Sequence, residues 1–276
     1  MLHDFHLHTL VSDGDLQPDA LLAEAARRGV THASITDHDA LGAYQWRDGG
    51  IFEAARRAGI ELTVGIEMDA DLDGQEVHVL GYDIALDSRP LRRHLDHVRQ
   101  ARFERARREI GIVNEKLGAG SIHEGEIFVA GRETLMKPHF IHPLLDRGRF
   151  ATYEEANAWY RQNVKSGVSV PKPDIAEAID LIHRAGGWAA LAHPGYYERD
   201  GHLITGHLEA LHALGLDAIE LAYPYAACSP HVFSAEREQA FIEGLRRAAE
   251  PFGYRFTRGS DCHSAGDFQK VYGKPS

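Results

Sequence analysis

The chain has 276 residues, of which 43% are hydrophobic and 26% are charged, a balance that is ordinary for a globular protein with one sizeable core. Its formal net charge of −11 argues against a broad surface for duplex nucleic acid, which normally needs many lysines and arginines. No apolar run reaches the roughly 20 residues of a membrane span, and residues 1–4 lack the pattern of a secretion signal, so we expect a cytoplasmic protein without a membrane partner.

The first third of the chain alternates short apolar runs with amphipathic segments. This alternation is typical of successive strand and helix units and of a mostly parallel sheet. Pro18 in a first turn and Gly29 after a last turn mark the ends of the first helix. We predict strands over residues 1–8, 30–35, 60–67 and 76–82, and helices over residues 18–28 and 51–58.

Residues from about 90 to 170 break this alternation, because they are strongly charged and nearly free of strand-like runs. Apolar residues at helical spacing predict a long helix over residues 91–117, and two shorter helices are predicted over residues 138–146 and 153–164. We interpret residues 91–170 as a helical insertion that covers the active site. Residues 1–90 and 171–276 would then form the α/β domain that carries the site.

The alternation of strands and helices resumes after the predicted insertion. The glycine pair at residues 186–187 ends one helix and leads into a short apolar strand. We predict helices over residues 174–185, 205–214 and 234–250, and strands over residues 188–192, 218–222 and 254–259. The fold class that follows is α/β.

Side chains that bind metals recur where the predicted strands end. His6 and His8 are two residues apart at the end of the first strand, so the alternation of a strand places both imidazoles on one face. Other strands carry or precede further imidazoles and carboxylates: Asp37, His38, Asp39, Glu67, His78, His193, Asp261 and His263. Such groups are costly to bury without partners, and bound cations would offset that cost.

Short motifs surround these side chains along the whole chain. They are His6-Leu7-His8-Thr9, Ser12-Asp13-Gly14, Thr36-Asp37-His38-Asp39, Gly65-Ile66-Glu67, Val77-His78, Ala192-His193-Pro194 and Gly259-Ser260-Asp261-Cys262-His263. As a set and in this order they resemble the motifs of the polymerase and histidinol phosphatase (PHP) family of phosphoesterases. The resemblance implies a distorted (β/α)7 barrel, similar to a TIM barrel, with a trinuclear metal centre on its C-terminal face.

The resemblance also implies which side chains hold each ion. The ligands would be His6, His8, Glu67 and Asp261 for the first ion, the bridging Glu67 with His78 and His193 for the second, and Asp13, His38 and His263 for the third. This mixture of nitrogen and oxygen ligands suits two or three divalent ions of manganese, zinc or iron.

We expect this centre to hydrolyse a phosphate ester without a serine or cysteine nucleophile. A hydroxide that bridges two of the ions would attack phosphorus, because coordination to a metal lowers the pKa of water toward neutrality. The residues that would hold this hydroxide are His6, His8, Glu67, His193 and Asp261. Asp37 and Asp39, which flank His38, either orient ligands or cap the turn.

Residues of the predicted insertion are candidates for substrate binding. The segment Leu135-Met136-Lys137-Pro138-His139-Phe140 resembles a stretch that carries a phosphate-binding arginine in family members acting on 3',5'-bisphosphonucleotides. The basic candidates here are Arg132, Lys137 and His139, and Arg258 is another. Alternatively, Arg132 is a surface residue and Arg258 forms a salt bridge in the barrel wall. The layout implies a small nucleotide-like substrate, either a bisphosphonucleotide or a short 5'-phosphorylated oligonucleotide.

Several alternatives stay open at this point. Tyr196 and Tyr197 stand where the bisphosphonucleotide subgroup often has an arginine, and related subgroups open cyclic ribose phosphates or hydrolyse histidinol phosphate. Amidohydrolases also begin with a His-x-His motif, but they usually bridge their ions through a modified lysine, and no lysine lies near a predicted strand end before the insertion. A metal-binding domain without activity is the non-enzymatic alternative.

Overall fold

The computed structural model describes residues 1–199 and 204–274, and within them seven strands form one sheet in the order β1-β2-β3-β4-β5-β6-β7. The strands are β1 (Leu2–Leu7), β2 (Val30–Ile35), β3 (Glu61–Leu72), β4 (Gln75–Tyr82), β5 (Trp188–Leu191), β6 (Ala218–Ala222) and β7 (Arg255–Arg258). Neighbouring strands are parallel, except that β4 runs antiparallel to both β3 and β5. The α/β class and the mostly parallel sheet are therefore confirmed.

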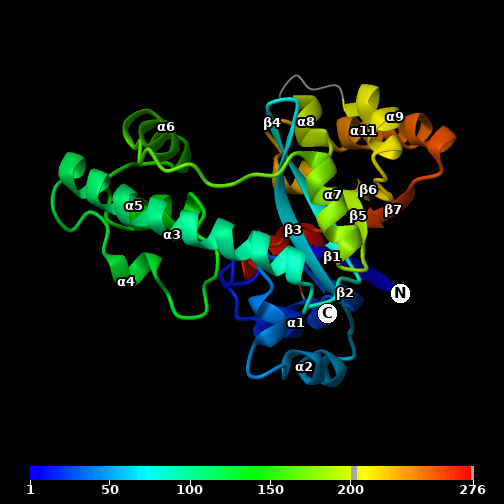
Figure 1. The fold of residues 1–276 in the computed structure, drawn as a ribbon, viewed down its shortest axis with the longest axis horizontal. Coiled ribbons are helices and arrows are strands. Elements are labelled where there is room, and N and C mark those ends of the chain that lie inside the picture. The colour runs from blue at the N-terminus through cyan, green and yellow to red at the C-terminus, as the bar shows by residue number, and fades with distance from the viewer. Residues whose placement is uncertain (200–203, 275–276) are drawn as a thin grey trace.

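The helices surround this sheet and extend to one side of it (Figure 1). They are α1 (Pro18–Arg27), α2 (Ile51–Ala58), α3 (Arg89–Leu117), α4 (Glu124–Ile127), α5 (Pro138–Asp146), α6 (Tyr153–Asn163), α7 (Ile175–Arg184), α8 (Gly195–Arg199), α9 (Leu208–Ala213), α10 (Tyr225–Cys228), α11 (Ala235–Ala249) and α12 (Ala265–Tyr272), with short 3-10 turns at Gly42–Gln45, Ile204–His207 and Glu250–Phe252. In the described ranges, no helix is both long enough and apolar enough to cross a membrane.

Strand β3 is longer than the sequence analysis predicted. It continues beyond residue 67 to Leu72 and returns as β4 through a tight turn at Asp73 and Gly74. Both turn residues have positive φ angles, 54° and 86°, as expected for a two-residue hairpin whose twist matches that of its strands. The extension matters for the site because it adds Asp69, opposite His78 in the antiparallel register, to the edge where the metal-binding side chains gather.

A closed barrel, which the family resemblance implied, is not confirmed. Among the described residues, β1 and β7 stand at opposite ends of the sheet order and form no ladder. The chain after β7 meets the end of β1 instead: the Asp261 N–H donates to the His6 carbonyl at 2.9 Å, and the His8 N–H donates to the Cys262 carbonyl at 3.1 Å. These two bonds bring the first and last groups of predicted ligands together.

The main hydrophobic core lies between the sheet and its helices. Leu21, Leu22 and Ala25 of α1 are fully buried in it, and α7 contributes Ile179 and Ile182. Each such leucine or isoleucine stabilises the fold by about 1.5–3 kcal/mol relative to an exposed position.

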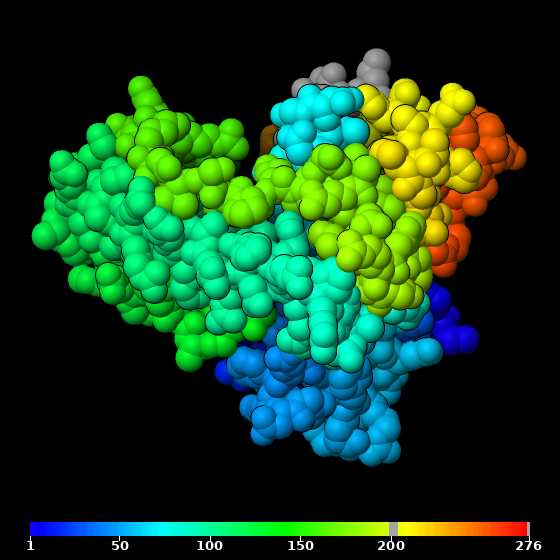
Figure 2. All heavy atoms as spheres, in the orientation of Figure 1, coloured from blue at the N-terminus to red at the C-terminus, as the bar shows by residue number. Residues whose placement is uncertain are grey.

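The long helix α3 joins this core to a second, smaller one. Near its start, Leu91 and Leu95 pack in the main core, whereas Ile110 and Val113 pack with residues of α4, α5 and α6. Figure 2 shows these helices as one lobe, with a notch between the lobe and the β3–β4 hairpin. The boundaries of residues 91–170 as an insertion, and its role in covering the site, stay predictions.

Candidate metal centre

All nine predicted metal ligands gather at one edge of the sheet. They come from β1 or the chain after it (His6, His8, Asp13), from the chain after β2 (His38), from β3 (Glu67) and β4 (His78), and from the chain after β5 (His193) and after β7 (Asp261, His263). The parallel strands end at this edge, and β4 returns from it, so side chains far apart in sequence become neighbours.

Glu67 lies at the centre of this cluster and is fully buried. Imidazole nitrogens surround both of its carboxylate oxygens. Around Oε2 at 3.2 Å lie Nε2 of His6, His8 and His38, and around Oε1 lie Nδ1 of His78 at 2.9 Å and Nε2 of His193 at 3.2 Å. A single carboxylate that faces five imidazoles is placed to bridge more than one cation.

Asp261 forms a second carboxylate position beside Glu67. Its Oδ1 lies 3.0 Å from His8 Nε2 and 3.4 Å from His6 Nε2, while its Oδ2 accepts a hydrogen bond from the Tyr223 hydroxyl at 2.8 Å. Asp261 has a φ of 55°, and His193 has a φ of 27°. Positive φ angles cost energy for residues other than glycine, and at a functional site such strain can fix the position of a side chain.

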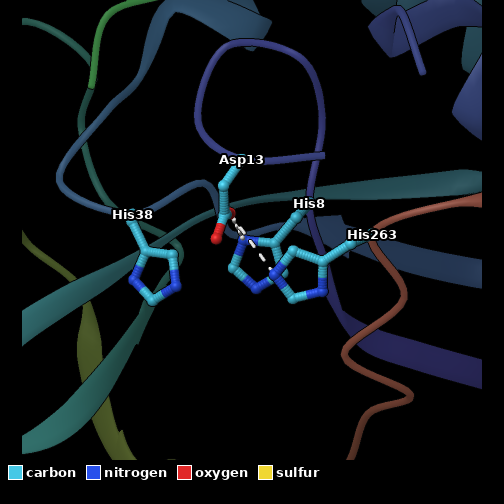
Figure 3. Close-up of side chains that lie close together, drawn as sticks. All are labelled: His8, Asp13, His38 and His263. Atoms are coloured by element: carbon cyan, nitrogen blue, oxygen red, sulfur yellow. Dashed lines mark ion pairs between the residues drawn. The ribbon is translucent and has the colours of Figure 1, made fainter. Parts of the chain in front are cut away.

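The third group forms around Asp13, on the loop after β1 (Figure 3). Its Oδ1 lies 3.3 Å from His263 Nε2 and 3.7 Å from His8 Nδ1. The rings of His8 and His263 stack at a centroid distance of 4.2 Å, and His38 stands on the other side of the carboxylate. These four side chains offer ligand atoms close enough to hold one ion.

The residues fit divalent cations because the facing atoms lack other partners. His6 Nε2, His8 Nε2 and Glu67 Oε2 are buried and form no hydrogen bond with any residue that the structure describes. Two ligands about 2.1 Å from one ion, at about 90–110° to each other, lie roughly 3.0–3.4 Å apart. The nitrogen–oxygen distances within the cluster, 3.0–3.4 Å around these atoms, have this spacing.

The division of the ligands among the ions stays a prediction. The structure groups His78 with His38 and Glu67, and it groups His193 with His6 and Glu67, whereas the family resemblance assigned both His78 and His193 to one ion. His8 also belongs to two groups, because its two ring nitrogens face different carboxylates.

The electrostatics of the cluster favour cations beside carboxylates. Burial alone lowers the pKa of an imidazole, but Glu67 and Asp13 raise the pKa of His38 to about 9. In the same way Asp13 and Asp261 overcome burial and raise the pKa of His263 to about 10. Burial raises the pKa of Glu67, yet the imidazoles around it hold that pKa well below its usual range. A bound divalent ion would stabilise the same carboxylates by its positive charge.

Glu220 is a residue of this site that the sequence analysis missed. It lies in β6 and is fully buried, with Oε1 3.0 Å from His6 Nδ1 and Oε2 accepting the His193 N–H at 2.8 Å. A carboxylate on one ring nitrogen directs the other nitrogen of His6 toward the cluster. Gly259 leaves room for it, because a Cβ there would lie 2.2 Å from Glu220 Oε1. The only sequence signal was one acidic residue inside an apolar strand.

In the described structure, neither of the aspartates that flank His38 forms a hydrogen bond or an ion pair with its ring. Asp37 accepts hydrogen bonds from the Thr9 N–H at 2.7 Å and from the Ser12 hydroxyl at 2.6 Å, so it braces the loop that carries Asp13. The residue that faces the outer nitrogen of His38 is Asp69, whose Oδ1 lies 3.2 Å from Nδ1. Of the two roles left open, Asp37 supports a loop rather than the imidazole beside it.

The four predicted substrate-binding residues occupy different surroundings. Lys137 lines a cavity beside Asp13. His139 is buried, its Nδ1 accepts the Met136 N–H at 2.9 Å, and burial together with Arg132 lowers its pKa to about 4, so its imidazole is neutral. Arg132 donates to the Ile127 carbonyl at 3.0 Å at the end of α4. Arg258 lines a separate cavity, with its guanidinium over the Tyr272 ring.

The cavity beside Asp13 has a volume of about 540 Å³ and lies between α3, α5, α6 and the segment that precedes α7. It brings Lys137 together with cations that the sequence analysis did not select. Its charged lining residues are Asp13, Asp69, Glu76, Arg102, Arg105, Lys137, Arg161 and Lys172. Of the predicted substrate-binding residues, the structure places only Lys137 in this lining, and the roles of the others stay predictions.

Comparison with known proteins shows what this arrangement is similar to. The PHP domain model matches residues 4–220. The chain is 31% identical over 265 residues to a 5'-3' exoribonuclease of Haemophilus influenzae, with 95% of this chain and 89% of the relative covered. It is 29% identical over 270 residues to a 3',5'-nucleoside bisphosphate phosphatase of Chromobacterium violaceum, with 96% and 88% covered.

Solved structures show the same fold. A protein of Bifidobacterium adolescentis, assigned as a metal-dependent phosphoesterase, has a TM-score of 0.78 and 26% identity, over 99% of this chain and 89% of that one. An amidohydrolase of Chromobacterium violaceum with bound sulfate has a TM-score of 0.79 and 27% identity, over 96% and 88%. In this chain the residue at the centre of the cluster is Glu67, a glutamate rather than a lysine.

Proposed function

Because this chain belongs to the PHP domain family of metal-dependent phosphoesterases, we propose that it hydrolyses a phosphate ester of a small nucleotide-like substrate. The substrate is a 3',5'-bisphosphonucleotide or a short 5'-phosphorylated oligonucleotide. The observation that carries this proposal is a cationic cavity that opens directly beside the carboxylate–imidazole cluster.

The cluster would hold two or three divalent ions through His6, His8, Asp13, His38, Glu67, His78, His193, Asp261 and His263. Such ions, when bound, lower the pKa of water toward neutrality and neutralise charge on phosphate oxygens. We assign the catalytic role to His6, His8, Glu67, His193 and Asp261, because their ring nitrogens and carboxylate oxygens face one another at the buried centre of the cluster. Glu220 fixes the ring of His6, and Tyr223 fixes Asp261 by donating to it.

The cavity supplies a second position for negative charge. Burial and the neighbouring Arg161 lower the pKa of Lys137, and Arg105 acts in the same direction, while Glu76 and Glu109 oppose them without reversing the shift. These cations therefore lie close enough to repel one another. In the described part of the chain, neither Lys137 nor Arg161 forms an ion pair with a carboxylate. A phosphate would relieve this repulsion through charge-assisted hydrogen bonds. A substrate with two phosphates could place one at the metal cluster and the other at Lys137.

A substrate comparison tests the proposal. With Mn²⁺ or Zn²⁺ present, kcat/KM for a 3',5'-bisphosphonucleotide or a 5'-phosphorylated dinucleotide is expected to exceed that for the corresponding 5'-monophosphate by at least about tenfold, since one charge-assisted contact contributes at least ~1.4 kcal/mol. Phosphate release measures the rate. Faster hydrolysis of a cyclic ribose phosphate, of histidinol phosphate or of an amide would contradict the proposed substrate class.

A change at Lys137 tests the position of the second phosphate. Lys137→Ala is expected to raise KM for the bisphosphonucleotide by about 10–100-fold, because a contact between a phosphate and a cation contributes about 1.5–3 kcal/mol. The value of kcat should change little, since Lys137 lies apart from the metal cluster. KM for a monophosphate that lacks the second group should also stay close to its original value.

Lys116→Ala is the matched control, since this exposed lysine lies in the last turn of α3, away from the cavity. Arg161→Ala should act in the same direction as Lys137→Ala. An unchanged KM in both Lys137→Ala and Arg161→Ala would show that the cavity does not bind the substrate.

A further inference from the structure

One buried arginine of α3 reaches the edge of the metal cluster. Arg102, in the middle of the helix, is only 4% exposed. Its Nη2 donates at 2.7 Å to Asp39 Oδ2 and at 2.7 Å to Asp69 Oδ2. Asp39 and Asp69 are buried as well, so the guanidinium is the positive charge that lets two carboxylates lie side by side away from water.

Asp69 connects this arginine to a predicted metal ligand. Its Oδ2 accepts from Arg102, and its Oδ1 lies 3.2 Å from His38 Nδ1. The other nitrogen of His38, Nε2, faces Glu67 Oε2 at 3.2 Å. An acceptor on Nδ1 keeps the proton of a neutral imidazole on that nitrogen and leaves Nε2 free as a ligand.

Asp39 closes the network from the backbone side. Its Oδ1 accepts the Asp69 N–H at 3.3 Å, and its own N–H donates to the Glu67 carbonyl at 2.8 Å. Asp39 has a φ of 47°, a backbone conformation that is unfavourable for this residue unless its contacts hold it there. The ion pairs of Arg102 therefore reach both a ligand's partner and the backbone beside Glu67.

We propose that Arg102 is a positioning residue of the metal centre: it holds Asp69 in place as the acceptor for His38 and so aims His38 Nε2 at the cluster. The inference rests on the proposed function only because it takes His38 as a metal ligand. Without the guanidinium, two buried carboxylates would repel each other, and Asp69 would turn away from His38 or take up a proton. Helix α3, which also carries Arg105 into the cavity, would thus support the metal centre directly.

A purely structural role for Arg102 gives different results. If Arg102 only attached α3 to the sheet, its loss would lower the melting temperature without a specific effect on metal binding. If it positions His38 through Asp69, metal affinity must fall, and the effects of changing Arg102 and Asp69 must not add.

The experiment is a double-mutant cycle on metal affinity. Arg102→Met, Asp69→Asn and the double variant are stripped with chelator and titrated with Zn²⁺ by calorimetry, with no substrate present. Arg102→Met is expected to weaken the binding of at least one ion by about tenfold or more, within the range found when supporting partners of metal ligands are removed. In the Asp69→Asn background, the same change should have almost no further effect. Arg102→Lys, which keeps the charge, should recover part of the affinity.

Arg99→Met is the matched control, because Arg99 lies one turn earlier on α3, is half exposed, pairs with Glu133 at 3.7 Å and lies over the Phe103 ring rather than beside the cluster. Its zinc affinity should equal that of the unchanged protein. Equal zinc affinity in Arg102→Met, or additive losses in the double variant, would overturn the proposal. If Arg102→Met does not fold, Arg102→Lys and Arg102→Gln carry the test, with an intermediate loss expected for lysine and the larger loss for glutamine. Because no substrate is used, a wrong substrate class would leave these results unchanged.

Discussion

Glu67→Gln is expected to lower kcat by at least about a thousandfold, which corresponds to ~4 kcal/mol of transition-state stabilisation. Glu67 faces five imidazoles with its two oxygens, and an amide offers one neutral oxygen and one NH₂ group in their place. The NH₂ group cannot bind a cation, so the loss should affect more than one ion. Metal content per chain, measured by mass spectrometry after dialysis, should therefore fall together with phosphate release.

Glu61→Gln is the control for this change. Glu61 begins the same strand, β3, but it is exposed and lies at the opposite end from the cluster. The Glu61→Gln variant should keep its full metal content and its full rate of phosphate release. If Glu67→Gln retained both its metal and its activity, Glu67 would not be a bridging ligand, and the mechanism assigned to the cluster would be wrong.

The elements that sequence patterns predicted well have clear local signals at both ends. The helix Ile51–Ala58 was predicted with the bounds that the structure shows, because Gly59 ends it with a φ of 73° that glycine adopts without strain. The strands Val30–Ile35 and Ala218–Ala222 are short and mostly buried, and their bounds were also correct. In these cases local propensity and tertiary burial agree.

Two missed features had local signals in the sequence. The extension of β3 alternates buried Met68 and Ala70 with Asp69 and Asp71, and it ends in an Asp-Gly turn, which is a strong hairpin signal. The predicted strand nevertheless ended at residue 67, before these aspartates. The helix Ala265–Tyr272 was also missed, although Ser264 caps it by accepting the Asp267 N–H at 3.2 Å.

The convergence of the nine candidate ligands was predictable because each lies in a short motif that resembles one of a known family. The residues that support them were not. Glu220 is a lone acid in an apolar strand, and Arg102 is one of many arginines on a charged helix that looks solvated from its sequence. Their roles depend on distances across the fold, such as the 2.7 Å from Arg102 to Asp69, and spacing along the chain does not encode such distances.

Removal of the metal ions is expected to abolish hydrolysis and to lower the melting temperature by an amount that grows with pH. In the metal-free protein, protonated His38 and His263 take over the positive charge beside Asp13, Glu67 and Asp261. The pKa of His38 is raised from 6.5 to about 9, and that of His263 to about 10. Because these folded pKa values lie above the unfolded value, the stabilisation is complete below about pH 6.5 and is lost as the pH rises through 9–10. For His38 the difference corresponds to about 3 kcal/mol.

The stability of the metal-bound protein changes with pH in the opposite direction. Metal binding requires neutral imidazoles, so the affinity for the ions rises as protons leave. The melting temperatures of chelator-treated and metal-reconstituted protein are measured by calorimetry at pH 6, 7.5 and 9. Plotted against pH, the two melting-temperature curves should move apart as the pH rises. Asp13→Asn is the matched variant, because Asp13 helps to raise the pKa of both His38 and His263. The melting temperature of the metal-free variant should therefore change less with pH. A constant difference between the two curves would mean that protons and metal ions do not compete for these side chains, and the cluster would then not be the metal site.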